Sequence, residues 1–119
     1  MSEITIYHNP QCSNSRGALA LIRERGIEPT IIEYLKAPPS KEQLKIMMAD
    51  AGITPRDLLR AKETVYAELE LDDARWTDDE LVDFMLQYPV LMNRPVVVTA
   101  LGTRLCRPPE LVLEILPVV

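Results

Sequence analysis

The pattern of apolar and polar residues changes its period several times along the chain. Alternating positions rich in β-branched residues predict strands over residues 3–7 and 30–34, and apolar positions at helical spacing predict a helix over 13–25. Gly26 directly follows this helical pattern and is expected to cap its C-terminus. A helix between two strands predicts a parallel pair joined by a right-handed crossover. The helix residues expected to be buried are Ala18, Leu19, Leu21 and Ile22.

The middle of the chain has a helical pattern with clear start signals. The predicted capping boxes are Ser40 with Gln43 and Thr77 with Glu80. Between them, Pro55 begins a short helix, and residues 61–71 have helical propensity with weak periodicity. The apolar side of the last helix in this block is expected to contain Leu81, Phe84, Met85 and Tyr88. Together these elements predict a helical insertion over about residues 40–88.

Strand patterns return near the C-terminal end of the chain. Residues 96–99 predict a buried strand, Gly102 a turn, and residues 103–106 an antiparallel partner strand. A pair of prolines then precedes a last helix over residues 111–116. The order of elements is therefore β-α-β, helical insertion, β-β-α. This order predicts a single α/β domain with a mixed four-stranded sheet over the whole chain.

The composition narrows the class of protein. A chain of 119 residues with 47% hydrophobic content is long enough for one domain with its own core. Its 13 basic and 18 acidic residues give a formal net charge of −5, which argues against nucleic acid and anionic membrane surfaces as partners. The apolar runs are too short to span a bilayer. We therefore expect neither a nucleic-acid partner nor a membrane partner.

The cysteine and histidine content points to a reducing compartment and away from a metal. The sequence does not open with a basic segment followed by an apolar one, so no signal peptide is expected. Cys12 and Cys106 lie far apart and are expected to be free thiols in the cytoplasm. One histidine and two cysteines are too few for a structural zinc site. No phosphate-binding glycine loop is present either, so no bound cofactor is expected.

The segment YHNPQCSNSR places Cys12 between the first predicted strand and the first predicted helix. Unpaired N–H groups and the positive end of the dipole at a helix start favour a thiolate and hold an anion. The alternative is that Cys12 is a small buried apolar residue, as lone cysteines often are. Its polar neighbours favour the chemical role. Cys106 lies within a strand pattern, and for it the structural interpretation is favoured.

The spacing around Cys12 excludes two related chemistries. Ser15 stands where a Cys-x-x-Cys motif has its second cysteine, so Cys12 cannot form a disulfide within the motif. An outside thiol must then resolve an oxidised Cys12, and glutathione with glutaredoxin is the cytoplasmic candidate. A phosphatase cradle of the Cys-x5-Arg type would need arginine at position 18, which is alanine.

His8 and Ser15 each have two interpretations. His8 could favour the thiolate electrostatically as an imidazolium, or it could be a hydrogen-bonded structural residue in a turn. Ser15 could donate a hydrogen bond to the thiolate, or it could cap the first helix. The residues alone leave both pairs of interpretations open.

Four segments carry a resemblance to a known family. They are YHNPQCSNSR, the residues around Leu59–Arg60, NRPVVVT at 93–99 and LGTRLCRPPE at 101–110. In this order they resemble the glutaredoxin-coupled arsenate reductases, which have the thioredoxin fold. The resemblance implies a thioredoxin-like sheet and a cis peptide bond before Pro95. It also implies site residues: Cys12 as nucleophile, His8 as modulator of its pKa, and an oxyanion site of Arg60, Arg94 and Arg107.

The same resemblance implies an activity. Arsenate is expected to bind among the three guanidinium groups, whose planar fork suits a tetrahedral oxyanion. The Cys12 thiolate is expected to displace hydroxide or water from arsenic, and glutathione to attack the adduct so that arsenite forms. Glutaredoxin would then reduce the mixed disulfide on Cys12. Two alternatives stay open: a glutathione-linked thiol reductase acting on another oxyanion or on mixed disulfides, and a non-catalytic interaction protein of the same fold.

Overall fold

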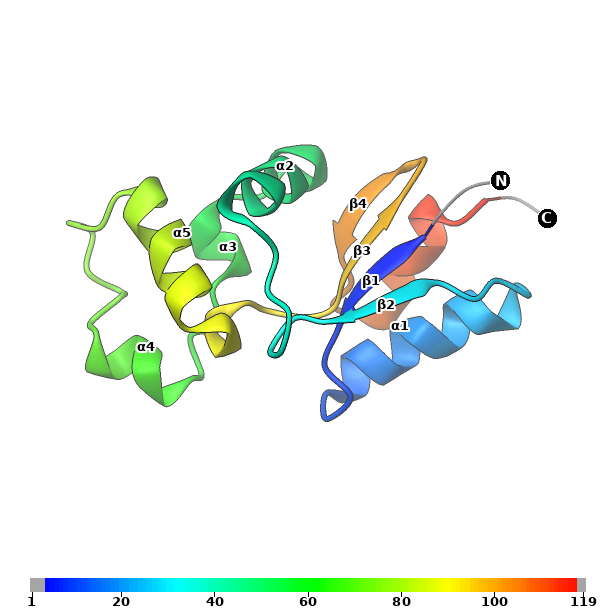
Figure 1. The fold of residues 1–119 in the computed structure, drawn as a ribbon, viewed down its shortest axis with the longest axis horizontal. Coiled ribbons are helices and arrows are strands. Elements are labelled where there is room, and N and C mark those ends of the chain that lie inside the picture. The colour runs from blue at the N-terminus through cyan, green and yellow to red at the C-terminus, as the bar shows by residue number, and fades with distance from the viewer. Residues whose placement is uncertain (1–3, 118–119) are drawn as a thin grey trace. The chain divides into compact units, whose positions relative to one another are not determined.

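A mixed sheet organises the first of two compact units of the chain (Figure 1). The computed structural model describes residues 4–117, and this unit comprises its residues 4–37 and 94–117. The strands lie in the order β2-β1-β3-β4, with bounds β1 Thr5–His8, β2 Thr30–Glu33, β3 Val96–Thr99 and β4 Gly102–Leu105. β1 pairs in parallel with β2 and antiparallel with β3, and β3 pairs antiparallel with β4. The predicted α/β class and mixed four-stranded sheet are confirmed.

The strand bounds differ from the predicted ones by single residues. β3 covers the four residues that the pattern indicated. Glu3, where the first strand was predicted to begin, lies outside the described residues, and β1 extends one residue further, to His8. β4 begins at Gly102 and ends at Leu105, so Cys106 follows the strand and does not lie in it.

The core of this unit lies between the sheet and two helices, α1 (Ser13–Glu24) and η2 (Pro109–Ile115). Ala18, Leu19 and Ile22 of α1 are buried as predicted, while Leu21 packs partly buried against the same core. The core residues from the other elements include Ile4, Ile6, Val97, Val112 and Ile115. Both helices therefore cover the same face of the sheet, the one to which Ile6 and Val97 point.

Two glycines in this unit have a clear local reason. A Cβ atom on Gly17 would lie 3.0 Å from Cγ of Pro109, so the glycine permits the close approach of α1 to η2. Gly26 has a φ of 75°, in the left-handed region that ends a helix, as the sequence predicted.

The last helix differs in type from the prediction. η2 is a 3₁₀ helix over Pro109–Ile115, whereas the pattern indicated an ordinary helix over 111–116. Pro108, directly before η2, and Pro109, its first residue, supply no N–H groups, and the segment is only seven residues long. Short proline-led segments of this kind commonly close with the tighter i to i+3 hydrogen bonds.

The second compact unit, residues 38–93, is helical. Its elements are α2 (Lys41–Ala51), α3 (Pro55–Leu58), α4 (Thr64–Glu68), α5 (Asp78–Gln87) and η1 (Pro89–Leu91). Both predicted capping boxes are present, and Thr54 forms a third with Asp57. The unit is somewhat longer than the insertion predicted over about 40–88. Of the segment 61–71, only the five residues of α4 are helical, in agreement with its weak periodicity.

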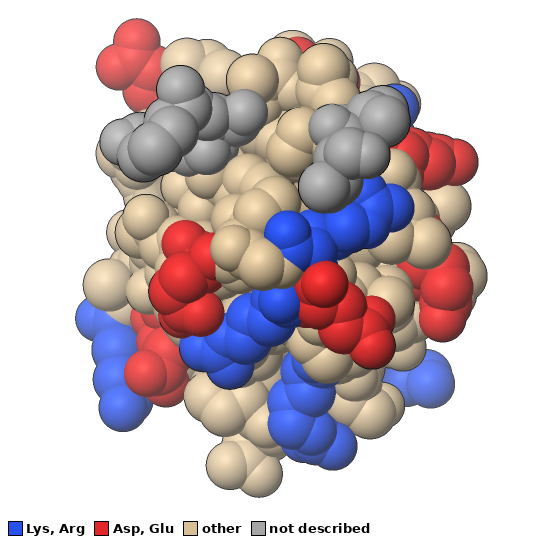
Figure 2. Space-filling model, turned by 90° about the vertical axis from the view of Figure 1, so that its right-hand side faces the viewer, with Lys and Arg blue, Asp and Glu red and all other residues tan. Residues whose placement is uncertain are grey.

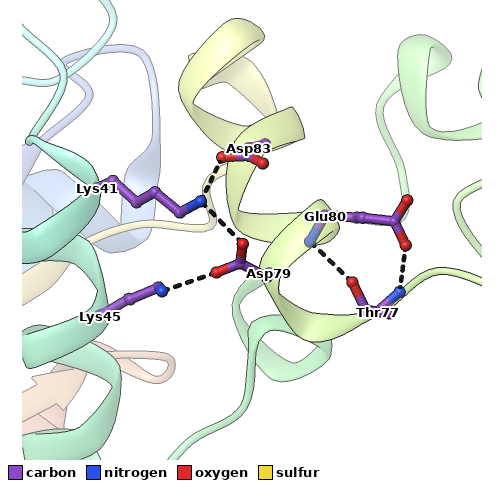
Figure 3. A network of polar contacts seen from close by, with 6 residues as sticks. All are labelled: Lys41, Lys45, Thr77, Asp79, Glu80 and Asp83. Carbon is purple, nitrogen blue, oxygen red and sulfur yellow. Dashed lines mark hydrogen bonds and ion pairs between the residues drawn. The ribbon is translucent and has the colours of Figure 1, made fainter.

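Ion pairs connect α2 to α5 within this unit (Figure 3). Nζ of Lys41 lies 3.0 Å from Oδ2 of Asp79 and 2.9 Å from Oδ1 of Asp83. Nζ of Lys45 lies 2.7 Å from Oδ1 of Asp79. Figure 3 also shows the capping box of Thr77 and Glu80 at the start of α5. Since these side chains are largely exposed, each ion pair contributes little to the stability of the unit.

Burial of apolar side chains does more to hold α5 than these ion pairs do. Leu81 and Met85 are buried as predicted, together with Val82, which the prediction did not include. Phe84 and Tyr88, which were predicted on the same face, are only partly buried. The apolar stripe is therefore centred closer to Val82 than the sequence pattern indicated.

The charged residues are mixed rather than segregated on the face shown in Figure 2. There, acidic and basic side chains lie interspersed over the described residues, without one large area of a single sign. Among residues 4–117, every helix is too short or too polar to cross a lipid bilayer.

Candidate active site

The sheet topology brings the candidate residues of the first unit to one edge. β1 and β2 are parallel, and β4 runs in the same direction because both β1 and β4 pair antiparallel with β3. The carboxyl ends of β1, β2 and β4 therefore share an edge with the start of β3. Cys12 follows β1, Arg94 precedes β3 and Arg107 follows β4, so all three arrive at this edge.

Cys12 is the N-cap residue of α1 and is half-buried. Its backbone is extended, and its sulfur makes no capping hydrogen bond of good geometry, although the Ser15 and Asn14 N–H groups of the first turn lie close enough to act on its charge. The Cys12 N–H donates to the Asn9 carbonyl at 3.0 Å, and the Arg16 N–H donates to the Cys12 carbonyl at 3.0 Å. The sulfur thus lies at the start of the helix, where the first N–H groups have no acceptor within the helix.

The surroundings of Cys12 favour its thiolate. Burial raises the pKa of the thiol, but hydrogen bonds from the Ser15 backbone, the Arg94 side chain, the Asn14 backbone and the Arg107 side chain together outweigh it, so the pKa lies below its ordinary value. Two of these four donors are N–H groups of the first turn of α1 and two are guanidinium groups. The same donors can compensate the charge of an oxyanion beside the sulfur.

Arg107 connects Cys12 to the start of β3. Its Nη1 atom lies 3.7 Å from Sγ of Cys12 and donates a hydrogen bond of 2.9 Å to the Arg94 carbonyl. Arg94 is buried, with 9% of its surface exposed, whereas Arg107 is partly exposed. The structure thus brings two of the three predicted arginines to the sulfur, one from the interior and one nearer to solvent.

The peptide bond between Arg94 and Pro95 is cis, as the family resemblance implied. The bond between Arg107 and Pro108 is also cis, and this was not predicted.

His8 and Ser15 form a buried pair on either side of the cysteine loop, residues 9–12, which connects β1 to α1 and carries Cys12. Nδ1 of His8 lies 2.6 Å from Oγ of Ser15, and the Asn9 N–H donates to the same Oγ at 3.0 Å. Burial lowers the pKa of His8, Glu33 raises it, and Arg23 and Arg16 lower it further, with a lowered pKa as the result. This direction disfavours the imidazolium form on which the electrostatic interpretation of His8 depends.

The contact between Ser15 and the thiolate comes from the backbone. The prediction was that Ser15 donates a hydrogen bond to the thiolate, and among the groups that lower the pKa of Cys12, Ser15 acts through its backbone N–H. The hydroxyl is fully buried and is occupied by His8 and the Asn9 N–H. Ser15 is also not the N-cap, because that position belongs to Cys12. Its hydroxyl instead ties the first turn of α1 to the end of β1.

Arg60 belongs to the helical unit, where it follows α3. Its Nε donates to Oε1 of Glu63 at 3.1 Å, and its N–H donates to the Leu91 carbonyl at 2.7 Å. The side chain is about four-fifths buried. Its part in an oxyanion site remains a prediction.

Asn9 is a site residue that the sequence analysis missed. It is buried, and its Oδ1 accepts a hydrogen bond of 3.0 Å from the Gln11 N–H, while its carbonyl accepts from Cys12. Asn9 therefore shapes the turn that presents the cysteine. The signal for this role was present, since an Asn-Pro pair directly after a strand is typical of a side-chain-stabilised turn.

Cys106 is fully buried in the core, and burial raises its pKa to about 12. The structural interpretation of this residue fits its position. Within residues 4–117, no group of three or more His, Cys, Asp or Glu side chains is arranged to hold a metal ion.

The depressed pKa of Cys12 predicts a pH profile for alkylation. The thiolate reacts, so the rate with iodoacetamide should rise through a midpoint below about 8.5, the value of a free thiol, and level off above it. Arg107→Ala removes one donor to the thiolate and should move the midpoint to higher pH. The rates are measured by intact-protein mass spectrometry across pH 5–10 (roughly the range of shifted thiols).

The matched control for this profile is Arg104→Ala. Arg104 lies on β4 and pairs with Glu114 at 3.3 Å, and it is not among the groups that lower the pKa of Cys12. A midpoint at or above the free value in the unaltered protein, or equal shifts in both variants, would contradict stabilisation of the thiolate by Arg107 and the other donors.

This geometry defines a class of protein: a thioredoxin-like domain with one reactive-site cysteine at the start of the first helix. The chain belongs to the ArsC family, because the family model of that description matches residues 7–115.

Relatives with close sequences support the same assignment. The chain is 60% identical over 117 residues to the arsenate reductase of Escherichia coli K12, covering 98% of this chain and 83% of that protein. It is 59% identical over 114 residues to an arsenate reductase of Rhizobium meliloti, covering 96% and 81%. The solved arsenate reductase of Vibrio cholerae superimposes with a TM-score of 0.92 at 46% identity, covering 96% of this chain and 98% of that one.

Proposed function

We propose that this protein reduces arsenate to arsenite. The observation that carries the proposal is a half-buried Cys12 thiol of lowered pKa with a guanidinium nitrogen of Arg107 3.7 Å from its sulfur. A thiolate is the nucleophile that attack on arsenic requires, and guanidinium groups compensate the charge of the oxyanion. The names of the relatives at 59–60% identity support arsenate as the substrate.

The first step is formation of a bond between the Cys12 sulfur and As(V). A hydroxyl group of the oxyanion leaves as hydroxide, or as water when it takes up a proton from solvent, and the oxidation state of arsenic does not change. Arg94 and Arg107 hold the remaining oxygens, and the Ser15 N–H and Asn14 N–H, which also lower the pKa of Cys12, add to the positive field around the oxyanion. From the family resemblance, Arg60 is proposed as the third oxyanion-binding arginine.

The second step is reduction by an outside thiol. The thiolate of glutathione attacks the Cys12 sulfur, and the electron pair of the S–As bond stays with arsenic, which leaves as arsenite, As(III). The product on the protein is a mixed disulfide of Cys12 and glutathione. Glutaredoxin and a second glutathione reduce this disulfide, which restores the thiol and yields glutathione disulfide.

Dependence on an outside thiol follows from the cysteine positions. Cys12 and Cys106 are both free, and Cys106 is sealed in the core. Ser15 occupies the position that could have supplied a resolving thiol within the motif. Glutathione and glutaredoxin are therefore the proposed partners, and the cytoplasm, where they keep thiols reduced, is the proposed location. No nucleic-acid or membrane partner enters the proposal.

The proposed roles of His8 and Ser15 are to hold the cysteine loop. The 2.6 Å contact between them fixes the first turn of α1 against the end of β1, and this turn carries the Ser15 N–H that lowers the pKa of Cys12. His8 then affects the pKa of Cys12 through this geometry rather than through a positive charge.

The test is turnover with arsenate, glutathione and glutaredoxin. We expect arsenite to form only when all three are present with the protein, and phosphate to inhibit without being consumed. A protein that turns over small mixed disulfides at the same or a higher rate, with no arsenite formed, would instead be a general glutathione-linked thiol reductase. The lowered pKa of Cys12 argues against a non-catalytic vestige, for which an ordinary thiol pKa is expected.

A further inference from the structure

Tyr34 has a buried hydroxyl that the fold does not use. The residue directly follows β2 and is fully buried, with 0% of its surface exposed. Its hydroxyl makes no hydrogen bond of good geometry among the described residues. Because phenylalanine would fill the same space without a buried polar atom, the hydroxyl costs stability. A group of this kind in a native structure calls for an explanation.

The position of Tyr34 places that hydroxyl at the candidate active site. Glu33, the last residue of β2, is in register with His8, so Tyr34 comes level with Asn9 at the sheet edge where Cys12 lies. Burial raises the pKa of the hydroxyl, the charge of Arg94 and polar contacts with Asn9 and Arg94 lower it, and the charge of Cys12 raises it. The groups that act on Tyr34 are thus the ones that surround the reactive sulfur.

A phenol can join two of these neighbours where a benzene ring cannot. Its oxygen can accept a hydrogen bond from a guanidinium N–H and donate its proton to an amide oxygen. Oδ1 of Asn9 already accepts from the Gln11 N–H at 3.0 Å, and an amide oxygen has a second lone pair. Gln11 directly precedes Cys12. A small approach of the Arg94 guanidinium and the Asn9 amide oxygen to the Tyr34 hydroxyl would therefore link Arg94 to the turn that carries the cysteine.

We propose that Tyr34 is a positioning residue of the oxyanion site, which holds the Arg94 guanidinium against the cysteine loop when an anion, either the Cys12 thiolate itself or an oxyanion bound beside it, is present. The hydroxyl accepts from Arg94 and donates to Asn9, so that the arginine and the sulfur approach the substrate as one unit. The inference rests on the proposed function for the identity of the oxyanion, but its effect on the thiol does not depend on arsenate.

The test is Tyr34→Phe, compared with the unaltered protein in three measurements. The pH midpoint of Cys12 alkylation should rise by about 0.5–1 pH unit, because Arg94 is less well held beside the thiolate. The KM for arsenate should rise about 10-fold. The melting temperature should stay the same or rise, because a buried hydroxyl without a good partner is removed. A merely structural role predicts the opposite sign for melting and no shift of the midpoint.

The matched control is Tyr7→Phe. Tyr7 is a buried tyrosine on the neighbouring strand β1, and burial alone raises its pKa, with no charged site residue contributing. This variant should leave the midpoint and the KM within about twofold of the unaltered protein. If Tyr34→Phe changes neither quantity more than Tyr7→Phe does, the inference is overturned.

A second variant tests the route through Arg94. In an Arg94→Gln background, Tyr34→Phe should change the alkylation midpoint by much less than it does alone, since the two residues act as a pair. An undiminished shift in that background would also overturn the inference. Failure of the unaltered protein to produce arsenite would reject the proposed function. Because the alkylation midpoint is measured without arsenate, it would still test the role of Tyr34 in that case.

Discussion

Replacement of Cys12 by serine is expected to abolish arsenite formation, with a loss of at least about 10³-fold in kcat. The serine keeps the position at the start of α1 and the donors around it, but a hydroxyl is not ionised near neutral pH and cannot form the disulfide through which arsenic is reduced. Oxyanion binding should persist, because Arg94 and Arg107 remain in place. The measurement is arsenite production with glutathione and glutaredoxin, together with phosphate binding by calorimetry.

The control for this variant is Cys106→Ala. Cys106 is the other thiol of the chain, but it is buried in the core and burial raises its pKa to about 12. Its loss should cost about 1 kcal/mol of stability and leave turnover within about twofold. If Cys12→Ser retained full activity, the nucleophile would be misassigned. If Cys106→Ala were inactive while still folded, the second thiol would have a role that its burial does not suggest.

Much of the fold could be predicted because its signals are local. Alternation of β-branched residues marks the strands, and capping boxes such as Thr77 with Glu80 mark helix starts to the residue. The type of the last helix could not be predicted in this way. A short segment after two prolines is compatible with either hydrogen-bond pattern, and packing of η2 against α1 and β4 decides between them.

The candidate site was predicted less completely, for two physical reasons. Residue type does not say whether a side chain or a backbone N–H makes a contact, so the sequence alone could not indicate that Ser15 acts on the thiolate through its N–H. The hydroxyl was instead engaged by His8, seven residues away in sequence. In addition, Tyr34 reads as an ordinary strand residue. Only the register of β2 with β1 brings it level with Asn9.

The grouping of Arg94 and Arg107 at Cys12 could also not be predicted from the spacing of residues along the chain. Arg94 and Arg107 precede and follow strands that a sequence pattern can locate, but their meeting at Cys12 depends on the strand order β1-β3-β4. The family resemblance supplied that grouping in advance. Spacing along the chain could not, since Arg107 lies 95 positions after Cys12.

Replacement of Arg94 by alanine is expected to lower kcat/KM for arsenate by about 10²–10³-fold. Two losses combine in this variant. The guanidinium that lowers the pKa of Cys12 is removed, so less thiolate is present at neutral pH. The oxyanion also loses a donor that is buried, with 9% exposure, where charge is poorly screened by water. The alkylation midpoint of Cys12 should therefore rise in the same variant.

These two losses can be separated by pH. Above the raised midpoint the thiolate is restored, so the part of the defect due to the thiol should disappear, while the part due to oxyanion binding should remain as a raised KM. Arg94→Lys keeps the charge but not the planar fork and should recover the midpoint more than the KM. Arg104→Ala, which removes a partly exposed arginine paired with Glu114, should leave both unchanged. Among the described residues, Arg94 is the more deeply buried of the two arginines that lower the pKa of Cys12, so its loss should have a large effect on oxyanion binding. If Arg94→Ala kept the arsenate dependence of the unaltered protein, the oxyanion site would therefore lie elsewhere.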